Sequence, residues 1–255
     1  MKAVVGICLL SLLAGALAWI GGPRTIRSRA TTERVAAARA PRCQPATTPT
    51  STPTRSLAAV ARTSTAAYRK PGAGLVARFR PRNQDRFHTV FAVLAARRNA
   101  RCEPVWYRVR LPIRPNGATG WVSARTVDVS SVDTKIVIHV RARRLELLRA
   151  GHVIFRSAIS TGAPDTPTPI GTFYVKERLV PADPNGPWGP AALGTSAYSA
   201  VLRSWTEGGP VGIHGTDDPT AIGRPVSHGC IRLPNAAMRR LFGLTPAGTP
   251  IVISR

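Results

Sequence analysis

The 255-residue chain carries 36 Lys and Arg against 12 Asp and Glu, which gives a formal net charge of +24. Residues 1–130 hold 22 of the basic and 4 of the acidic residues, so this half would attract polyanions. The export signal predicted at the start of the chain argues against nucleic acid as that polyanion and favours anionic wall polymers or lipid headgroups. Arg and Ala are common throughout, so charge alone assigns no function.

The N-terminal residues predict an export signal. Met1-Lys2 precedes an apolar run from Ala3 to Ile20, and Ala16-Leu17-Ala18 resembles a signal-peptidase site. We predict a signal peptide over residues 1–18; an uncleaved membrane anchor is the alternative, because the run approaches the ~20 residues that span a bilayer. Both readings place the protein outside the cytoplasmic membrane, secreted or held in the cell wall or periplasm, with membrane contact only if the leader is uncleaved.

Residues 19–60 are rich in Arg, Ala, Thr and Pro and have almost no large apolar side chains. Such a composition buries too little surface to offset the entropy lost on ordering. We therefore predict a disordered linker.

Residues 61–130 predict a small β domain, with short strands at 75–79, 89–94 and 105–111. The segment WYRVRLPIRPNGATGWVSA, residues 106–124, resembles the last hairpin of a bacterial SH3-like barrel. Such a module binds a wall ligand, here anionic wall polymers, or acts as a spacer packed on its neighbour. Both interpretations stay open.

Residues 131–255 also predict a mainly β domain with one clear helix. The helix is expected from Pro234 to Phe242, with Pro in its first turn and Gly243 at its end. Alternating apolar residues and Gly-bearing turns predict an antiparallel meander and further strands, over 134–140, 144–148, 152–156, 172–175 and 250–253.

Four cysteines are present, and Cys8 lies in the predicted signal. The three that remain are an odd number, which implies a free thiol or an intermolecular bridge in an exported protein. The simplest prediction is a disulfide between Cys43 and Cys102 with Cys230 free, but the sequence does not determine the pairing.

The strongest chemical signal is the pair of segments His214-Gly215-Thr216 and Ser227-His228-Gly229-Cys230-Ile231-Arg232. A thiol is a good nucleophile as a thiolate, and imidazole is suited to take its proton. Cys230 with a histidine base is therefore predicted to carry an acyl group as a thioester. Gly229 lets the backbone approach a carbonyl, and the Gly229 and Cys230 amides are candidate oxyanion donors.

These segments, with Ser160-Thr161-Gly162 and Thr168-Pro169-Ile170-Gly171-Thr172-Phe173, resemble the signature of the L,D-transpeptidase (YkuD) family over residues 133–255. The resemblance implies a peptidoglycan enzyme without metal or cofactor. Its thiol takes a tetrapeptide stem with loss of D-alanine and passes it to an amine, which makes a 3→3 cross-link. Hydrolysis by an L,D-carboxypeptidase reaction and exchange of D-amino acids use the same intermediate. Carbapenems should acylate the thiol.

The resemblance implies that His214 is the base, oriented by the Gly215 carbonyl, and that His228 shapes the pocket or binds the acceptor; spacing alone leaves the base open. Ser227 is expected to hydrogen-bond either ring. Arg232 binds a substrate carboxylate, or forms an ion pair with Asp217 or Asp218. Further substrate contacts are assigned to Gly215, Thr216 and Tyr198.

Two other functions would use parts of the same pattern. His214, His228 and Cys230 have the residue types of a zinc hydrolase site, but no Glu base lies nearby. A non-catalytic wall-binding protein would have little reason to retain the thiol and both histidines.

Overall fold

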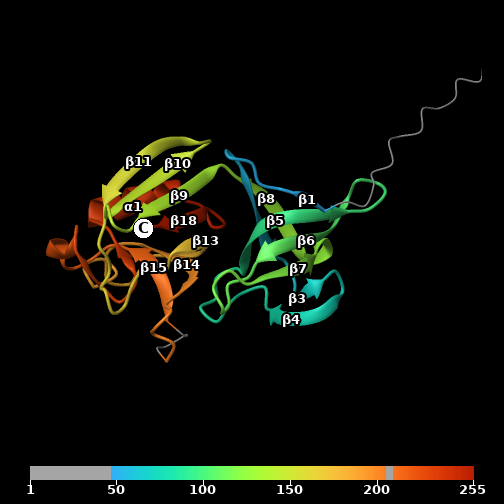
Figure 1. The fold of residues 1–255 in the computed structure, drawn as a ribbon, viewed down its shortest axis with the longest axis horizontal. Helices are drawn as coiled ribbons and strands as arrows, with labels where there is room; N and C mark the ends of the chain where they lie inside the picture. Colours follow the sequence, from blue (N-terminus) through green and yellow to red (C-terminus); the bar gives the residue numbers. More distant parts are fainter. Residues whose placement is uncertain (1–46, 205–208) are drawn as a thin grey trace, which may run out of the picture. The chain divides into compact units, whose positions relative to one another are not determined.

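The computed structural model describes residues 47–204 and 209–255, which belong to one compact unit. They contain two large β-sheets (Figure 1). The predicted signal 1–18, linker residues 19–46, Cys8 and Cys43 lie outside the described residues. Among the residues described, no helix has the length and apolar character needed to span a membrane.

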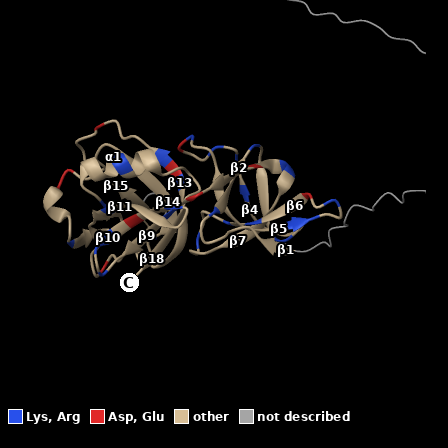
Figure 2. Cartoon of the chain, turned by 90° about the horizontal axis from the view of Figure 1, so that it is seen from above, with Lys and Arg blue, Asp and Glu red and all other residues tan. Residues whose placement is uncertain are grey.

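The first sheet contains eight strands, and every pair in it is antiparallel. Their order is β4-β3-β7-β6-β5-β2-β8, with β1 also paired to β5. Lys and Arg are scattered over its strands and turns, with few acidic residues among them (Figure 2). The strands are β1 (Thr47–Pro49), β2 (Ser56–Ala61), β3 (Thr65–Lys70), β4 (Ala73–Phe79), β5 (Val90–Arg98), β6 (Pro104–Arg110), β7 (Thr119–Ser123) and β8 (Val127–Val132).

The predicted strands of this half correspond to β4, β5 and β6. Residues 47–60, which were assigned to the linker, instead contain β1 and most of β2. The difference arises because residues 57–60, Leu-Ala-Ala-Val, are all apolar and pair on both sides, with β5 and with β8, so that tertiary pairing outweighs the linker-like composition around them. The SH3-like resemblance stays a prediction.

The second sheet has the order β11-β10-β9-β18-β13-β14-β15-β17 and is mixed, because β18–β9 and β15–β17 are parallel. The predicted meander corresponds to its edge, β9-β10-β11. A separate pair, β12 with β16, is also parallel. The strands are β9 (Thr134–His139), β10 (Arg144–Arg149), β11 (His152–Ala158), β12 (Thr161–Gly162), β13 (Gly171–Leu179), β14 (Ala192–Tyr198), β15 (Pro210–His214), β16 (Pro225–Ser227), β17 (Ile231–Arg232) and β18 (Pro250–Ser254).

One α-helix, α1 (Asn235–Leu244), accompanies this sheet in the described part of the chain. Met238 and Leu241 are its buried residues and join the core of the sheet. Gly243 lies inside the last turn rather than ending the helix, and Thr245 is the C-cap. The prediction of a mainly β fold with one helix is confirmed.

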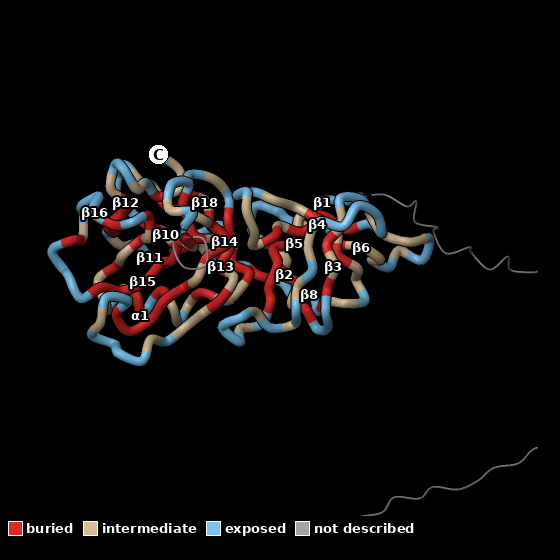
Figure 3. The backbone as a smooth tube through the Cα atoms, turned by 90° about the horizontal axis from the view of Figure 1, so that it is seen from below, coloured by how far each residue is buried: buried red, intermediate tan, exposed pale blue. Residues whose placement is uncertain are grey.

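Buried residues follow the strands of both sheets (Figure 3). The two sheets also contact each other through polar groups. The Tyr174 hydroxyl on β13 is buried and donates to the Val90 carbonyl on β5 at 2.9 Å. Asn83 Nδ2 donates to Glu177 Oε2, also on β13, at 2.7 Å. These bonds hold the loop before β5 against the second sheet.

Candidate active site

A parallel strand pair brings the two predicted motif segments together. Ile213 of β15 pairs with Ile231 of β17, and His214 pairs with Arg232. Continuing this register backwards sets Gly212 beside Cys230, and the Gly212 amide donates to Cys230 Sγ at 3.3 Å. The histidine thus ends one strand and the cysteine immediately precedes its neighbour.

The buried His214 ring is held in one tautomer. Nδ1 lies 2.6 Å from the Gly215 carbonyl oxygen, and since a carbonyl only accepts, Nδ1 must carry the proton. Trp188 covers the ring, with centroids 4.8 Å apart. The pKa of His214 is lowered to about 4, mainly because the ring is buried. The hydrogen bond to Gly215 raises this pKa by less than burial lowers it, and the positive charge of Arg232 lowers it further. The imidazole is therefore neutral at pH 7, with a lone pair on Nε2.

Gly212 lies between the two reactive side chains. Its amide contacts Cys230 Sγ, and a Cβ added to it would lie 3.8 Å from His214 Cδ2, the ring carbon bonded to Nε2. Burial raises the pKa of the Cys230 thiol, and the Gly212 N–H and the Arg232 charge offset this only in part. The resting pair is a neutral thiol beside a neutral imidazole, not an ion pair.

Ser227 closes the loop that carries Cys230. Its hydroxyl donates to the Cys230 carbonyl at 2.6 Å and accepts from the Gly229 amide at 3.1 Å. Both bonds are to backbone, whereas we had expected Ser227 to bond a histidine ring. The Gly229 amide is engaged by Ser227, so an oxyanion role would require that bond to open. Gly229 has φ 109°, a conformation that other residues rarely adopt.

The other two predicted motifs support this loop from outside. The Thr168 hydroxyl donates to the Gly229 carbonyl at 3.0 Å and accepts from the Gly162 amide at 2.9 Å. The Thr166 hydroxyl donates to the Ser227 carbonyl at 2.9 Å. β12 also pairs with β16, directly before the loop. The Ser-Thr-Gly and Thr-Pro segments therefore act as a scaffold for Cys230.

Asn235 is a positioning residue that the sequence analysis missed. Its Oδ1 accepts from the Thr216 amide at 2.8 Å and packs so closely on Gly215 that a Cβ there would collide with it. The sequence feature that could have indicated this role is a polar residue at the start of the helix, shortly after the Cys230 motif. Gly215 and Thr216 form the turn after His214, in which the Thr216 hydroxyl accepts from the Asp218 amide at 3.0 Å. Their predicted contacts to substrate stay predictions.

Cys230 opens into a cavity of about 500 Å³, here called the thiol cavity. His214, the exposed His228, Arg232 and Trp188 also line it. Arg232 forms no ion pair with Asp217 or Asp218 among the described residues, and its buried Nε has no partner there. Of the two readings for Arg232, this arrangement favours the substrate carboxylate.

The first sheet also contributes to this cavity, which the sequence analysis did not foresee. Asp85 and Phe87, from the loop between β4 and β5, line its wall. No local pattern in the sequence marks these residues, because the contact joins segments about 145 positions apart in the chain.

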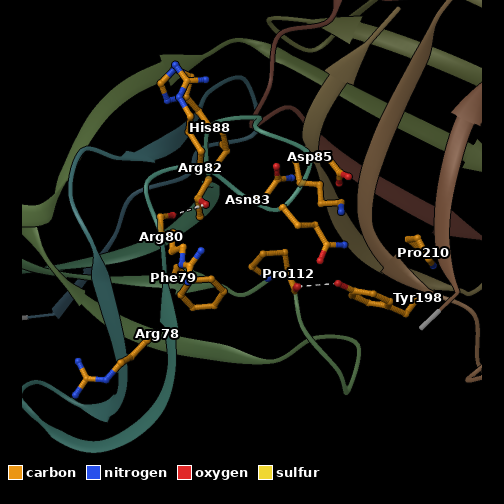
Figure 4. Close-up of a pocket in the computed structure, with 14 residues that line it drawn as sticks. Arg78, Phe79, Arg80, Arg82, Asn83, Asp85, His88, Pro112, Tyr198 and Pro210 are labelled. Carbon is orange, nitrogen blue, oxygen red and sulfur yellow. Dashed lines mark hydrogen bonds between the residues drawn. The ribbon is translucent and has the colours of Figure 1, made fainter. Parts of the chain in front are cut away.

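Tyr198 is not among the residues that line the thiol cavity, and its predicted substrate contact stays a prediction. Its hydroxyl donates to the Pro112 carbonyl at 2.9 Å, and its backbone exchanges hydrogen bonds with the Asn116 side chain. It lines a second cavity, shown with the Pro112 contact in Figure 4. Its position at the end of β14 directs it to the first sheet.

Two further predictions concern ligating groups. Over residues 47–204 and 209–255, no three His, Cys, Asp or Glu side chains are grouped as metal ligands would be, so the zinc alternative lacks a ligand cluster there. Cys102 is disulfide-bonded and Cys230 is free. Cys43, the predicted partner of Cys102, lies outside the described residues.

Comparison with known proteins identifies relatives of the second half. The model of the YkuD L,D-transpeptidase catalytic domain matches residues 133–253. YkuD of Bacillus subtilis, whose name assigns it to the L,D-transpeptidases, is 33% identical over 128 residues, which cover 50% of this chain and 70% of that protein. YqjB of the same organism, named likewise, is 30% identical over 132 residues, or 48% of this chain and 72% of that protein.

Solved structures also match. The Ldtfm–avibactam carbamoyl enzyme is 29% identical and has a TM-score of 0.38; the match covers 49% of each chain, so this chain spans about half of that protein. The catalytic domain of an Enterococcus faecium L,D-transpeptidase, solved by NMR, is 28% identical with a TM-score of 0.36. That match covers 48% of this chain and 97% of the domain.

Proposed function

The chain belongs to the YkuD family of L,D-transpeptidases, and from this premise we propose that it forms peptidoglycan cross-links through a thioester on Cys230. The observation that carries the proposal is a free thiol beside a neutral, tautomerically fixed imidazole in one cavity. We further propose that the enzyme acts outside the cytoplasmic membrane, as its leader sequence suggests.

In the first step, Cys230 Sγ attacks the carbonyl carbon of the third residue of a tetrapeptide stem. His214 Nε2 takes the thiol proton as the C–S bond forms. Because the pKa of His214 is about 4, the imidazolium is a strong acid and readily passes this proton to the leaving nitrogen. The C–N bond breaks, D-alanine departs as a neutral amine, and the acyl group remains on sulfur.

The charged groups of the thiol cavity have roles in this step. The Arg232 guanidinium supplies a positive charge two residues after Cys230, and we assign it to the terminal carboxylate of the donor stem. The Cys230 amide is the proposed oxyanion donor, joined by the Gly229 amide if its bond to Ser227 opens.

In the second step, an amine of a neighbouring stem attacks the thioester carbon. A C–N bond forms, the C–S bond breaks, and His214 relays the proton lost by nitrogen to the departing thiolate. The product is a 3→3 cross-link. Water or a free D-amino acid in place of the amine gives hydrolysis or exchange from the same intermediate, and His228, exposed at the cavity rim, is assigned to the acceptor side.

The test is intact-mass spectrometry after exposure to tetrapeptide muropeptides and, separately, a carbapenem. We expect one adduct per chain on Cys230 and a cross-linked dimer among the muropeptide products. Cys230→Ala should abolish both while keeping the circular dichroism spectrum of the native protein. Cross-linking retained by Cys230→Ala would refute the proposal, as would the absence of any adduct on the folded native chain.

A further inference from the structure

A second cavity, of about 610 Å³, adjoins the thiol cavity. Asp85, Lys176 and Pro210 line both, so the two spaces meet at a shared wall. The second cavity lies between the loop before β5 and the residues Tyr198 and Pro112 (Figure 4). A ligand that extends from the thiol cavity in this direction passes these three residues.

The charge at the shared wall is negative and unneutralised. Asp85 is exposed, and its carboxylate makes no ion pair or hydrogen bond among the described residues. The neighbouring Lys176 ammonium is already paired with Glu177 at 3.1 Å. A carboxylate in this position is suited to a cation that enters from outside.

The far wall of the second cavity carries the opposite charge. Arg78, Arg80 and Arg82 line it, and none of the three is in an ion pair within the described parts of the chain. The Arg82 guanidinium donates to the Arg86 carbonyl at 2.8 Å, which leaves its charge unneutralised. The cavity therefore offers an anion beside the thiol cavity and cations beyond it.

The loop that carries Asp85 is fixed. Asn83 Oδ1 accepts from the Phe87 amide at 2.9 Å, and the Asn83 backbone amide donates to the Phe87 carbonyl at 2.8 Å. The Asn83 side chain is then tied to Glu177 of β13. These bonds close the turn around Asp85 and hold it at the wall of the thiol cavity.

We propose that the second cavity binds the acyl acceptor, a peptide with one ammonium and several carboxylates. Asp85 receives the acceptor nitrogen at the shared wall while it is protonated; after this nitrogen loses a proton to solvent, the free amine moves on to the thioester on Cys230, and the arginines hold the carboxylates. The proposal rests on the transpeptidase function, and it assigns acceptor selection to the first sheet. The shared wall favours a peptide that continues toward Cys230 over a separate phosphate polymer, which would need cations at the wall rather than Asp85.

The experiment measures how the thioester is partitioned between acceptors. The full chain is acylated with a tetrapeptide donor, and the ratio of cross-linked to hydrolysed product is followed against acceptor concentration. An exposed charge pair contributes little, so Asp85→Asn should raise the acceptor KM about two- to fivefold, and Asp85→Lys should raise it further. Because Asp85 also lines the thiol cavity, the rate of thiol acylation is measured in each variant, and the acceptor KM is compared from the acylated enzyme onward.

Asp128→Asn is the matched control, because it removes one exposed carboxylate from the same sheet and lines neither cavity. It should leave the ratio unchanged. If the ratio of cross-linked to hydrolysed product were unaltered in both Asp85 variants while acylation was normal, only the proposed acceptor site would be wrong. If the native chain failed to be acylated, the transpeptidase function itself would be wrong. If Arg78→Gln with Arg80→Gln weakened binding of polyglycerol phosphate but not of the peptide acceptor, the cavity would serve a phosphate polymer and the inference would be wrong.

Discussion

The two sheets differ in the size of the side chains in their cores. The first sheet buries many alanines, among them Ala59, Ala61 and Ala67. The second is packed with large aliphatic residues, such as Ile136, Leu147 and others of its central strands. Each buried Leu or Ile contributes about 1.5–3 kcal/mol, much more than an alanine methyl group. The sheet that must hold reactive groups in register thus has the denser aliphatic support.

The sheets differ also in strand direction. All pairs of the first sheet are antiparallel, and its strands are joined by turns and loops. In the second, the parallel pair β15–β17 sets His214 beside Arg232, and its register continued backwards sets Gly212 beside Cys230. The base and the thiol are therefore held on neighbouring strands, two positions apart in register. The chemistry thus depends on the parallel pair, while the first sheet supplies a wall of the thiol cavity.

Among substitutions that keep the thiol, removal of the base His214 should have the largest effect on the rate of acylation. His214→Ala should lower the rate of thiol acylation by a carbapenem by about 10²–10⁴-fold at pH 7, the usual contribution of a positioned base. In the native chain this rate should fall in acid around pH 4, where the imidazole is protonated. Stopped-flow acylation over pH 3–9 checks both points. A greater loss in His228→Ala than in His214→Ala would exchange the two roles.

Core substitutions test the contrast in packing. Ile231 is fully buried on β17, so Ile231→Ala should lower the free energy of unfolding by about 2–5 kcal/mol. Ala59→Gly, in the buried strand β2 of the first sheet, should cost about 1 kcal/mol. Urea denaturation measures both, with Val226→Ala at an exposed site as the control. Equal losses from Ile231→Ala and Ala59→Gly would remove the proposed difference between the sheets.

Acid should destabilise the second sheet through His214. The pKa of this residue is about 4 in the folded chain and 6.5 ordinarily, so between these values the unfolded chain binds a proton that the folded chain does not. Stability is therefore unaffected above pH 6.5 and falls by about 3 kcal/mol as the pH drops to 4. His214→Gln should flatten this part of the profile. An unchanged difference between pH 7 and pH 4 in that variant would show that other groups cause the acid loss.

Much of the second half followed from sequence because its signals are local. Alternating residues predicted the meander β9-β10-β11, the motif selected Cys230, and the family resemblance rather than spacing favoured His214 over His228 as the base. The hydrogen-bond partners of Ser227 and Tyr198 did not follow, because both hydroxyls donate to backbone carbonyls that only the folded chain brings near. Side-chain type tells that a hydroxyl needs a partner, but only the fold decides which one.

The contacts between the two sheets could not be predicted from the sequence for a related reason. Periodicity gives the buried face of a strand, but not which distant loop covers that face. Asp85 and Phe87 stand in a polar turn that reads as ordinary surface, and their place at the thiol cavity depends on Asn83 bonding to Glu177. Strands β1 and β2 were likewise hidden in a segment whose composition matched a linker.

The smallest effect is expected at Asn235, which supports the turn after His214. Asn235→Ala would leave the buried Thr216 amide without its acceptor, at a cost of about 1–2 kcal/mol. Carbapenem acylation should slow by less than about tenfold, because the Gly215 carbonyl that orients His214 is loosened but not removed. Asn235→Asp keeps an acceptor oxygen near a helix N-terminus and should restore most of the rate. Equal losses in the two variants would mean that Asn235 acts by packing on Gly215 and Gly189 rather than through its hydrogen bond.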